Sequence, residues 1–98
     1  MRKIGLLHLI MFLFICASLA AQNVTVTGRV TEAGTGEPLI GGNVAVKGAP
    51  LGTIADMDGY YSLSVPSNSI LVFSYIGFEA KEIRVGNQRV INVALSEI

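Results

Sequence analysis

After residue 21, the sequence consists of short runs in which apolar and polar residues alternate, separated by glycine, proline, asparagine, aspartate and serine. A period of two is the pattern of a β-strand with one buried face, whereas an amphipathic helix repeats every three to four residues. This part of the sequence contains no helical period. Runs that recur about every ten residues are typical of a β-sandwich. The pattern therefore predicts one all-β domain, a seven-stranded Greek-key sandwich.

Each expected strand corresponds to one of these runs. They are Val24–Val30, Leu39–Val46, Gly52–Ala55, Tyr60–Val65, Ile70–Ile76, Glu79–Val85 and Val90–Leu95. The fifth run is apolar at nearly every position, which predicts a strand covered on both faces. It is also far too short to cross a membrane as a helix. Gly28 interrupts the first run and indicates a bulge or the close approach of another backbone.

A tight acidic turn between the third and fourth runs is the strongest local signal in the sequence. Asp58-Gly59 is among the best short hairpin signals, because glycine accepts the positive φ that such turns demand. After the turn, Tyr61, Leu63 and Val65 alternate with two serines. The stretch therefore predicts a β-hairpin that directs these three side chains into the core.

The same turn has part of the pattern of a calcium loop. An EF-hand loop needs oxygen ligands at positions 1, 3 and 5, glycine at 6 and glutamate at 12. With Gly59 at position 6, Asp58 and Asp56 occupy positions 5 and 3, but Ile54 and Val65 stand at positions 1 and 12. Two required ligands are missing, so we expect no metal here and a structural role for Asp56, whose carboxylate would cap the turn. A loose surface calcium site is the alternative, and no further residue supports it.

The first 20 residues have the pattern of a signal peptide. A positive start, Arg2-Lys3, precedes an apolar segment at 4–17 and small residues at the cleavage position. Cleavage is expected after Ala20 or Ala21, which predicts an exported chain. The alternative, an uncleaved anchor, is disfavoured because the apolar run is shorter than the roughly 20 residues of a spanning helix.

The expected mature domain, residues 22–98, contains neither histidine nor cysteine, since His8 and Cys16 both lie in the predicted signal. Such a domain cannot form a Ser-His-Asp or Cys-His arrangement, nor a zinc site with histidine or cysteine ligands. We therefore expect no enzyme and no cofactor. Five basic and seven acidic side chains give the mature domain a net charge of −2. This charge offers no basic stripe for nucleic acid and no polybasic patch for a membrane.

Five aromatic residues remain in the mature domain. Exposed and coplanar aromatic rings would suit sugar binding, and Tyr60 and Tyr75 are the candidates for that role. Aromatic side chains more often dominate the burial of a core. We therefore expect Tyr61, together with Phe73 or Tyr75, to fill the interior of the sandwich.

The motifs of the mature domain occur in an order that resembles one protein family. In sequence they are Val26–Val30, Glu37–Val44, Val46–Gly48, Gly52–Asp56, Asp58–Leu63 and Phe73–Phe78. This series resembles the carboxypeptidase-regulatory-like domain at the N-terminus of SusC/RagA-type TonB-linked outer-membrane transporters. The resemblance covers essentially the whole mature domain. The positions that carry it are Gly28, Pro38, Leu39, Gly48, Gly52, Thr53, Asp56, Asp58, Gly59, Tyr61, Leu63, Ser74, Tyr75, Gly77 and Phe78.

The resemblance implies a transthyretin-like sandwich in the periplasm that serves as an accessory or interaction domain in glycan or peptide uptake. In the family, the domain precedes a TonB-contacting segment, a plug and a barrel, so the implied partners are that plug and barrel and the TonB system. Because the sequence ends at Ile98, we expect a fragment, a truncated product or a free-standing relative. The module also accompanies zinc carboxypeptidases without catalysing their reaction. The alternatives are a secreted carbohydrate-binding module that uses Tyr60 or Tyr75, and a passive folding spacer.

Overall fold

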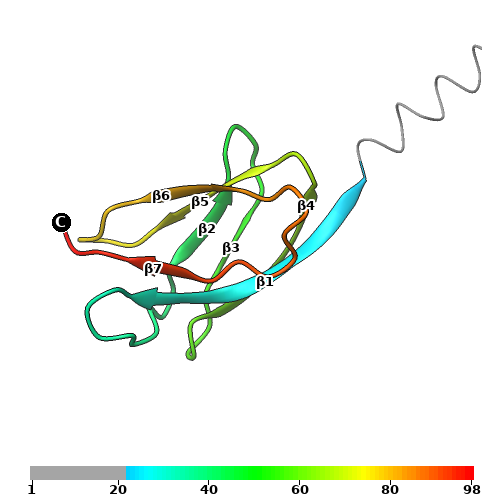
Figure 1. Cartoon of the computed structure of the whole chain (residues 1–98). Coiled ribbons are helices and arrows are strands. Elements are labelled where there is room, and N and C mark those ends of the chain that lie inside the picture. The colour runs from blue at the N-terminus through cyan, green and yellow to red at the C-terminus, as the bar shows by residue number, and fades with distance from the viewer. Residues whose placement is uncertain (1–21) are drawn as a thin grey trace, which may run out of the picture.

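The computed structural model describes residues 22–98, which form two β-sheets packed face to face (Figure 1). The strands are β1 (Asn23–Glu32), β2 (Asn43–Val46), β3 (Gly52–Ile54), β4 (Tyr60–Pro66), β5 (Ile70–Ser74), β6 (Lys81–Arg84) and β7 (Val93–Leu95). The predicted all-β sandwich of seven strands is confirmed. The predicted signal peptide lies outside the described residues. Within 22–98, no helix is long and apolar enough to cross a membrane.

The ten-residue strand β1 is the centre of the smaller sheet, whose order is β4-β1-β7. Its first seven residues pair antiparallel with β4, from Asn23 opposite Pro66 to Arg29 opposite Tyr60. Its last three residues pair in parallel with β7. The four-stranded sheet has the order β3-β2-β5-β6, and all its pairs are antiparallel. Strand β1, at the beginning of the described residues, therefore pairs both with β4 in the middle and with β7 near the end.

The core lies between the two sheets and is formed by the inward residues of β1, β2, β4, β5 and β7 together with residues of the connecting segments. Its buried apolar residues are Val26, Val30, Leu39, Val44, Val46, Ala55, Tyr61, Val65, Leu71, Phe73, Val85, Ile91, Val93 and Leu95. The rings of Tyr61 and Phe73 meet edge to face with their centroids 5.6 Å apart, a favourable arrangement of the two ring quadrupoles. Of the three β4 residues predicted to face inward, Tyr61 and Val65 are buried and Leu63 is partly buried.

The predicted hairpin at Asp58-Gly59 is wrong, because the two strands that flank the turn belong to different sheets. Strand β3 pairs with β2, whereas β4 pairs with β1. The chain does reverse at this turn, but in doing so it crosses from the four-stranded to the three-stranded sheet. A turn dipeptide specifies a local reversal, and long-range pairing decides which sheet each arm joins.

The prediction that the fifth run is covered on both faces is also wrong. In β5, Leu71 and Phe73 are buried, while Ile70 and Val72 on the opposite face are only partly buried. Ile76 lies beyond the strand in a turn and is 97% exposed. The run is apolar at nearly every position, yet β5 alternates between buried and partly buried residues because the core covers only one face of its sheet.

The strands β2, β3, β5, β6 and β7 are shorter than predicted. Strand β2 begins at Asn43 and not at Leu39, because Gly42 N donates a hydrogen bond to Leu39 O (3.1 Å) and closes a turn before the strand. Gly41 occupies that turn with a φ of 78°, in the left-handed region that favours glycine. Strand β6 covers only the central part of its predicted run, and β7 only the last part. Strands β3 and β5 end at Ile54 and Ser74, before the ends of their predicted runs.

Gly28 is a point of close backbone approach, as its position in the first run indicated. A Cβ atom at Gly28 would lie 1.8 Å from Ile91 O and 3.0 Å from Tyr61 Cε1. The hydroxyl of Tyr61 donates a 2.7 Å hydrogen bond to Ile91 O, and Ile91 N donates to Thr27 O at 2.8 Å. The ring of Tyr61 thus crosses the bare backbone of Gly28 and connects β4 to the segment that leads into β7.

We predict that Gly28→Ala lowers the free energy of unfolding by about 3 kcal/mol, the upper part of the range for overpacked cores. The new methyl group would meet backbone atoms of Ile91, which cannot move away without breaking the hydrogen bonds around that residue. Urea unfolding followed by circular dichroism measures the change.

Gly34→Ala is the matched control, because a Cβ atom at Gly34 has no neighbour within 4 Å. This variant should change the free energy of unfolding by less than about 0.5 kcal/mol. Equal stability of the two variants would contradict the account of Gly28.

Candidate functional site

The acidic turn between β3 and β4 is held by the carboxylate of Asp56. Asp56 Oδ1 accepts hydrogen bonds from the backbone N–H groups of Asp58 and Tyr60, both at 2.9 Å. The backbone adds a bond from Asp56 N to Tyr60 O (2.9 Å) and one from Gly59 N to Asp56 O (3.0 Å). The Asp56 carboxylate therefore caps the turn, as the sequence predicted.

Gly59 fixes this turn against the rest of the domain. Its φ of 82° lies in the left-handed region. A Cβ atom there would lie 2.7 Å from Val30 O and 2.9 Å from Pro38 Cβ. Gly59 O also accepts a 2.8 Å hydrogen bond from Val30 N. Both its conformation and its surroundings therefore require glycine.

No metal centre is formed in the part of the chain that the structure describes. Residues 22–98 contain no group of three or more histidine, cysteine, aspartate or glutamate side chains placed to hold an ion. Asp56 directs one oxygen into the turn, and Asp58 contributes only its backbone to the hydrogen bonds there.

The residues that carry the family resemblance are distributed over both sheets and do not meet in one pocket. Most belong to turns or to strand pairs: Gly48, Gly59 and Gly77 have positive φ, Thr53 pairs with Val44, Ser74 pairs with Asn43, and Phe78 forms a bridge with Glu97. Pro38 forms a bridge with Thr31, Leu39 is buried in the core, and Gly52 lies on β3 against Val44 O. Tyr75 and Phe78 meet edge to face at 5.6 Å. This distribution suits a set of positions that build the fold.

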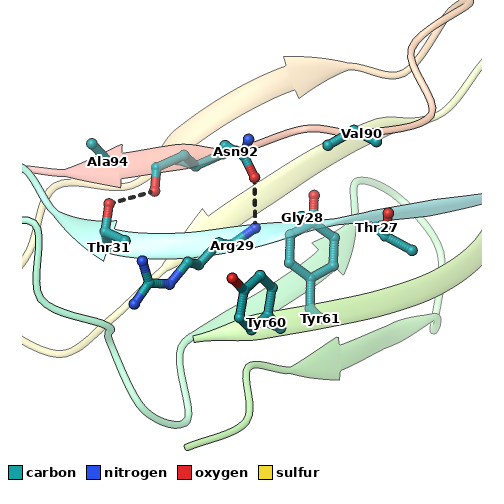
Figure 2. A pocket seen from close by; sticks show the side chains of 10 residues that line it. Thr27, Gly28, Arg29, Thr31, Tyr60, Tyr61, Val90, Asn92 and Ala94 are labelled. Atoms are coloured by element: carbon teal, nitrogen blue, oxygen red, sulfur yellow. Dashed lines mark hydrogen bonds between the residues drawn. The ribbon is translucent and has the colours of Figure 1, made fainter. Parts of the chain in front are cut away.

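An open groove of about 760 Å³ runs along the three-stranded sheet (Figure 2). Its lining includes Arg29 and Thr31 of β1, Tyr60 of β4, and Asn92 before β7. No carboxylate, histidine or cysteine lines the groove, so it has no general base and no metal ligand of those types. Its polar lining consists of one guanidinium, one amide and several hydroxyl groups, which can form hydrogen bonds.

Arg29 is held in a defined position beside this groove. Its Nε donates a 2.8 Å hydrogen bond to Asp58 O, and its guanidinium carbon lies 5.4 Å from the centroid of the Tyr60 ring. That distance is within the range of a cation–π interaction. On the other side of the strand, Arg29 N donates a 3.0 Å hydrogen bond to Asn92 Oδ1, which Figure 2 marks with a dashed line.

The two tyrosines proposed for sugar binding do not form one platform. Tyr60 is 54% exposed beside the groove, but Arg29 lies over its ring. Tyr75 follows β5 of the other sheet and is partly buried against Phe78. The only other aromatic residue of the groove is Tyr61, which is buried.

Sequence reasoning did not single out Arg29 or Asn92. Alternation along the first run places Arg29 on the face opposite to the buried valines, which indicates that its side chain points outward. Alternation could not predict the contacts of Arg29, because its partners are residues 58, 60 and 92, which are distant in the sequence. Nothing in the local sequence around Asn92 indicates that its side chain replaces a strand hydrogen bond.

Comparison with known proteins places the chain in a family. The model of the CarboxypepD_reg-like domain matches residues 26–97. The TonB-dependent receptor SusC of Bacteroides thetaiotaomicron is 45% identical over 92 residues, which cover 94% of this chain and 9% of the receptor. The TonB-dependent receptors P3 and P39 of Formosa agariphila are 47% and 39% identical, over 89% and 93% of this chain and 9% of each receptor.

The chain belongs to the CarboxypepD_reg-like domain family, and its resemblance to SusC-type TonB-dependent receptors is confirmed. It spans 9% of the length of each of these three curated relatives.

We predict that Asp56→Ala lowers the free energy of unfolding by about 1–2 kcal/mol, because two backbone N–H groups lose a charged acceptor. Asp58→Ala is the matched control, since the Asp58 carboxylate accepts no hydrogen bond from the described residues, and it should cost less than about 0.5 kcal/mol. Thermal unfolding measures both effects. A calcium-induced rise in the melting temperature that Asp56→Ala abolishes would contradict the structural role of this carboxylate.

We also predict that Tyr61 makes stability depend on pH in the alkaline range. Burial raises the pKa of Tyr61 to about 12 from its usual 10.0. Between these values the unfolded chain has lost the proton and the folded chain retains it, so the free energy of unfolding falls as the pH rises. The contribution is fully present below pH 10 and falls by at most about 1.4 kcal/mol per pH unit above it.

Urea unfolding of the wild type and of Tyr61→Phe across this range tests the pH dependence. Taking the difference between the two proteins cancels the other groups that titrate there. The stability of the wild type should decline relative to that of the variant between pH 10 and 12. Parallel curves would show that Tyr61 has its ordinary pKa.

Proposed function

We propose that this chain is a non-enzymatic accessory domain that acts through protein contacts in the periplasm, as part of a TonB-dependent outer-membrane receptor for nutrient uptake. The observation that carries the proposal is its 45% identity to the receptor SusC over 94% of the chain. The nutrient class we propose is a glycan or a peptide. The proposed partners are the plug and barrel of such a receptor and the TonB system.

The arrangement of the domain supports a role in binding and not in catalysis. Residues 22–98 contain neither histidine nor cysteine. The carboxylate of Asp56 in the acidic turn already accepts two backbone hydrogen bonds. The open groove beside Arg29 has no group in its lining that can act as a general base at neutral pH. These features favour an interaction surface.

Export of the chain is part of the proposal. We propose that residues 1–20 are a signal peptide and that residues 22–98 are the mature domain. The described strands begin at Asn23, so cleavage after Ala20 or Ala21 would leave β1 and all its pairs intact. The position of β1 is therefore compatible with both cleavage sites.

The proposal predicts a loss of uptake when the domain is removed from a receptor. In SusC of B. thetaiotaomicron, the segment that matches this chain would be deleted, and growth would be measured on a nutrient whose import requires that receptor. We expect slower growth at unchanged receptor abundance, and recovery when residues 22–98 of this chain replace the deleted segment. Unchanged growth after deletion would overturn the proposal.

Two controls separate an interaction domain from a passive spacer. Replacement by an unrelated β-sandwich of similar length should not restore growth, because it keeps the spacing and removes the surface. Restoration by that sandwich would favour the spacer. Restoration by the native segment but not by residues 22–98 would reject the proposal for this chain, provided that an immunoblot shows equal receptor levels.

A further inference from the structure

The outer face of the three-stranded sheet is rich in hydroxyl groups and has a single positive charge. Alternation along β1 and its register with β4 place these residues on the face that points away from the core. They are Thr25, Thr27, Arg29 and Thr31 on β1 and Tyr60, Ser62 and Ser64 on β4. No carboxylate occurs among them, although the domain as a whole has more acidic than basic residues. The local charge of this face is therefore opposite to the net charge.

The guanidinium of Arg29 is oriented but has no acidic partner. Its Nε donates to Asp58 O, and its central carbon lies over the Tyr60 ring. No acceptor among residues 22–98 binds its two Nη groups, and the one ion pair in the described region joins Lys47 to Glu82 on the other sheet (2.8 Å). A guanidinium with two terminal N–H groups in a plane matches the two oxygens of a carboxylate.

The groove next to Arg29 adds further donors. Asn92 also lines the groove. Its Oδ1 accepts from Arg29 N, and its Nδ2 donates no hydrogen bond to the described residues. The hydroxyl of Thr27 lies along the same lining, whereas that of Thr31 donates a 3.5 Å hydrogen bond to Val93 O. Figure 2 shows Asn92 and Arg29 joined across the edge of β1. Binding an anion here would require little reorganisation, because hydrogen bonds already hold both residues.

We infer that this groove binds a carboxylate side chain of a partner protein, presented by an extended acidic segment that lies along the outer face. A flat face of threonine and serine suits an extended peptide. A sugar acid is less well matched, because Arg29 covers the Tyr60 ring and no second outward aromatic residue offers a stacking surface. The inference rests on the geometry of Arg29 and holds whether or not the chain acts in a receptor.

The test is an NMR titration of the purified, ¹⁵N-labelled chain with the peptide acetyl-Glu-Thr-Glu-Thr-Glu-amide. The same peptide with glutamine in place of glutamate is the control ligand. We expect the glutamate peptide to shift the signals of Arg29, Tyr60 and Asn92, and to bind at least about tenfold more tightly than the glutamine peptide. Added salt should weaken this binding, because the groove is open to solvent.

Variants of the chain complete the test. Arg29→Gln should weaken binding about tenfold or more, and Arg29→Lys should recover only part of the loss, because lysine lacks the planar pair of donors. Arg84→Gln removes the same charge from β6 of the other sheet and should have no effect. Amide spectra report whether each variant is folded. If Arg29→Gln does not fold, the binding affinity of Arg29→Lys is compared with that of the wild type instead.

Three results would overturn the inference. The first is equal binding of the glutamate and glutamine peptides, and the second is equal binding by the wild type and the folded Arg29 variant. The third is binding of trigalacturonate at the same residues without binding of the glutamate peptide, which would assign the groove to an acidic glycan instead.

Discussion

The three-stranded sheet depends on one hydrogen bond that the absence of a side chain at Gly28 makes possible. Tyr61 reaches across β1 to Ile91 O only because no Cβ atom stands in its path. Successive residues of a strand face opposite sides. The inward contact between Gly28 and Tyr61 therefore also determines which residues are neighbours on the outer face. Arg29 follows Gly28 and Tyr60 precedes Tyr61, so the two outward residues are brought together by the two inward ones. The buried contact thereby positions the exposed groove.

The turn between β3 and β4 connects this arrangement to the other sheet. Asp56 holds the turn internally, and Gly59 lets it pack against Val30 and Pro38. Because Asp58 O accepts a hydrogen bond from Arg29, the same turn also orients the guanidinium. One short segment thus joins the two sheets and completes the environment of the groove.

Features that depend on nearby residues could be predicted from the sequence, and features that depend on distant pairing could not. The inward positions of Tyr61 and Val65 follow from alternation, and the turn at Gly59 follows from the conformational freedom of glycine. The sheet that each strand joins does not follow from such patterns, which is why a hairpin was predicted where the chain changes sheets. The site was missed for the same reason. Arg29 meets Tyr60 through a register between two strands, and Asn92 arrives from a third segment.

The parallel pairing of β1 with β7 has a consequence for the order in which the domain can form. The strand partners of Val30 to Glu32 in the sheet are Val93 to Leu95, more than 60 residues further along the chain. Contacts between residues so distant in sequence slow folding, because loop entropy is lost before the contact contributes. The central strand therefore cannot acquire both neighbours until nearly the whole domain has been synthesised. During synthesis, a chain with this topology therefore remains incompletely folded for longer than a chain built from local hairpins.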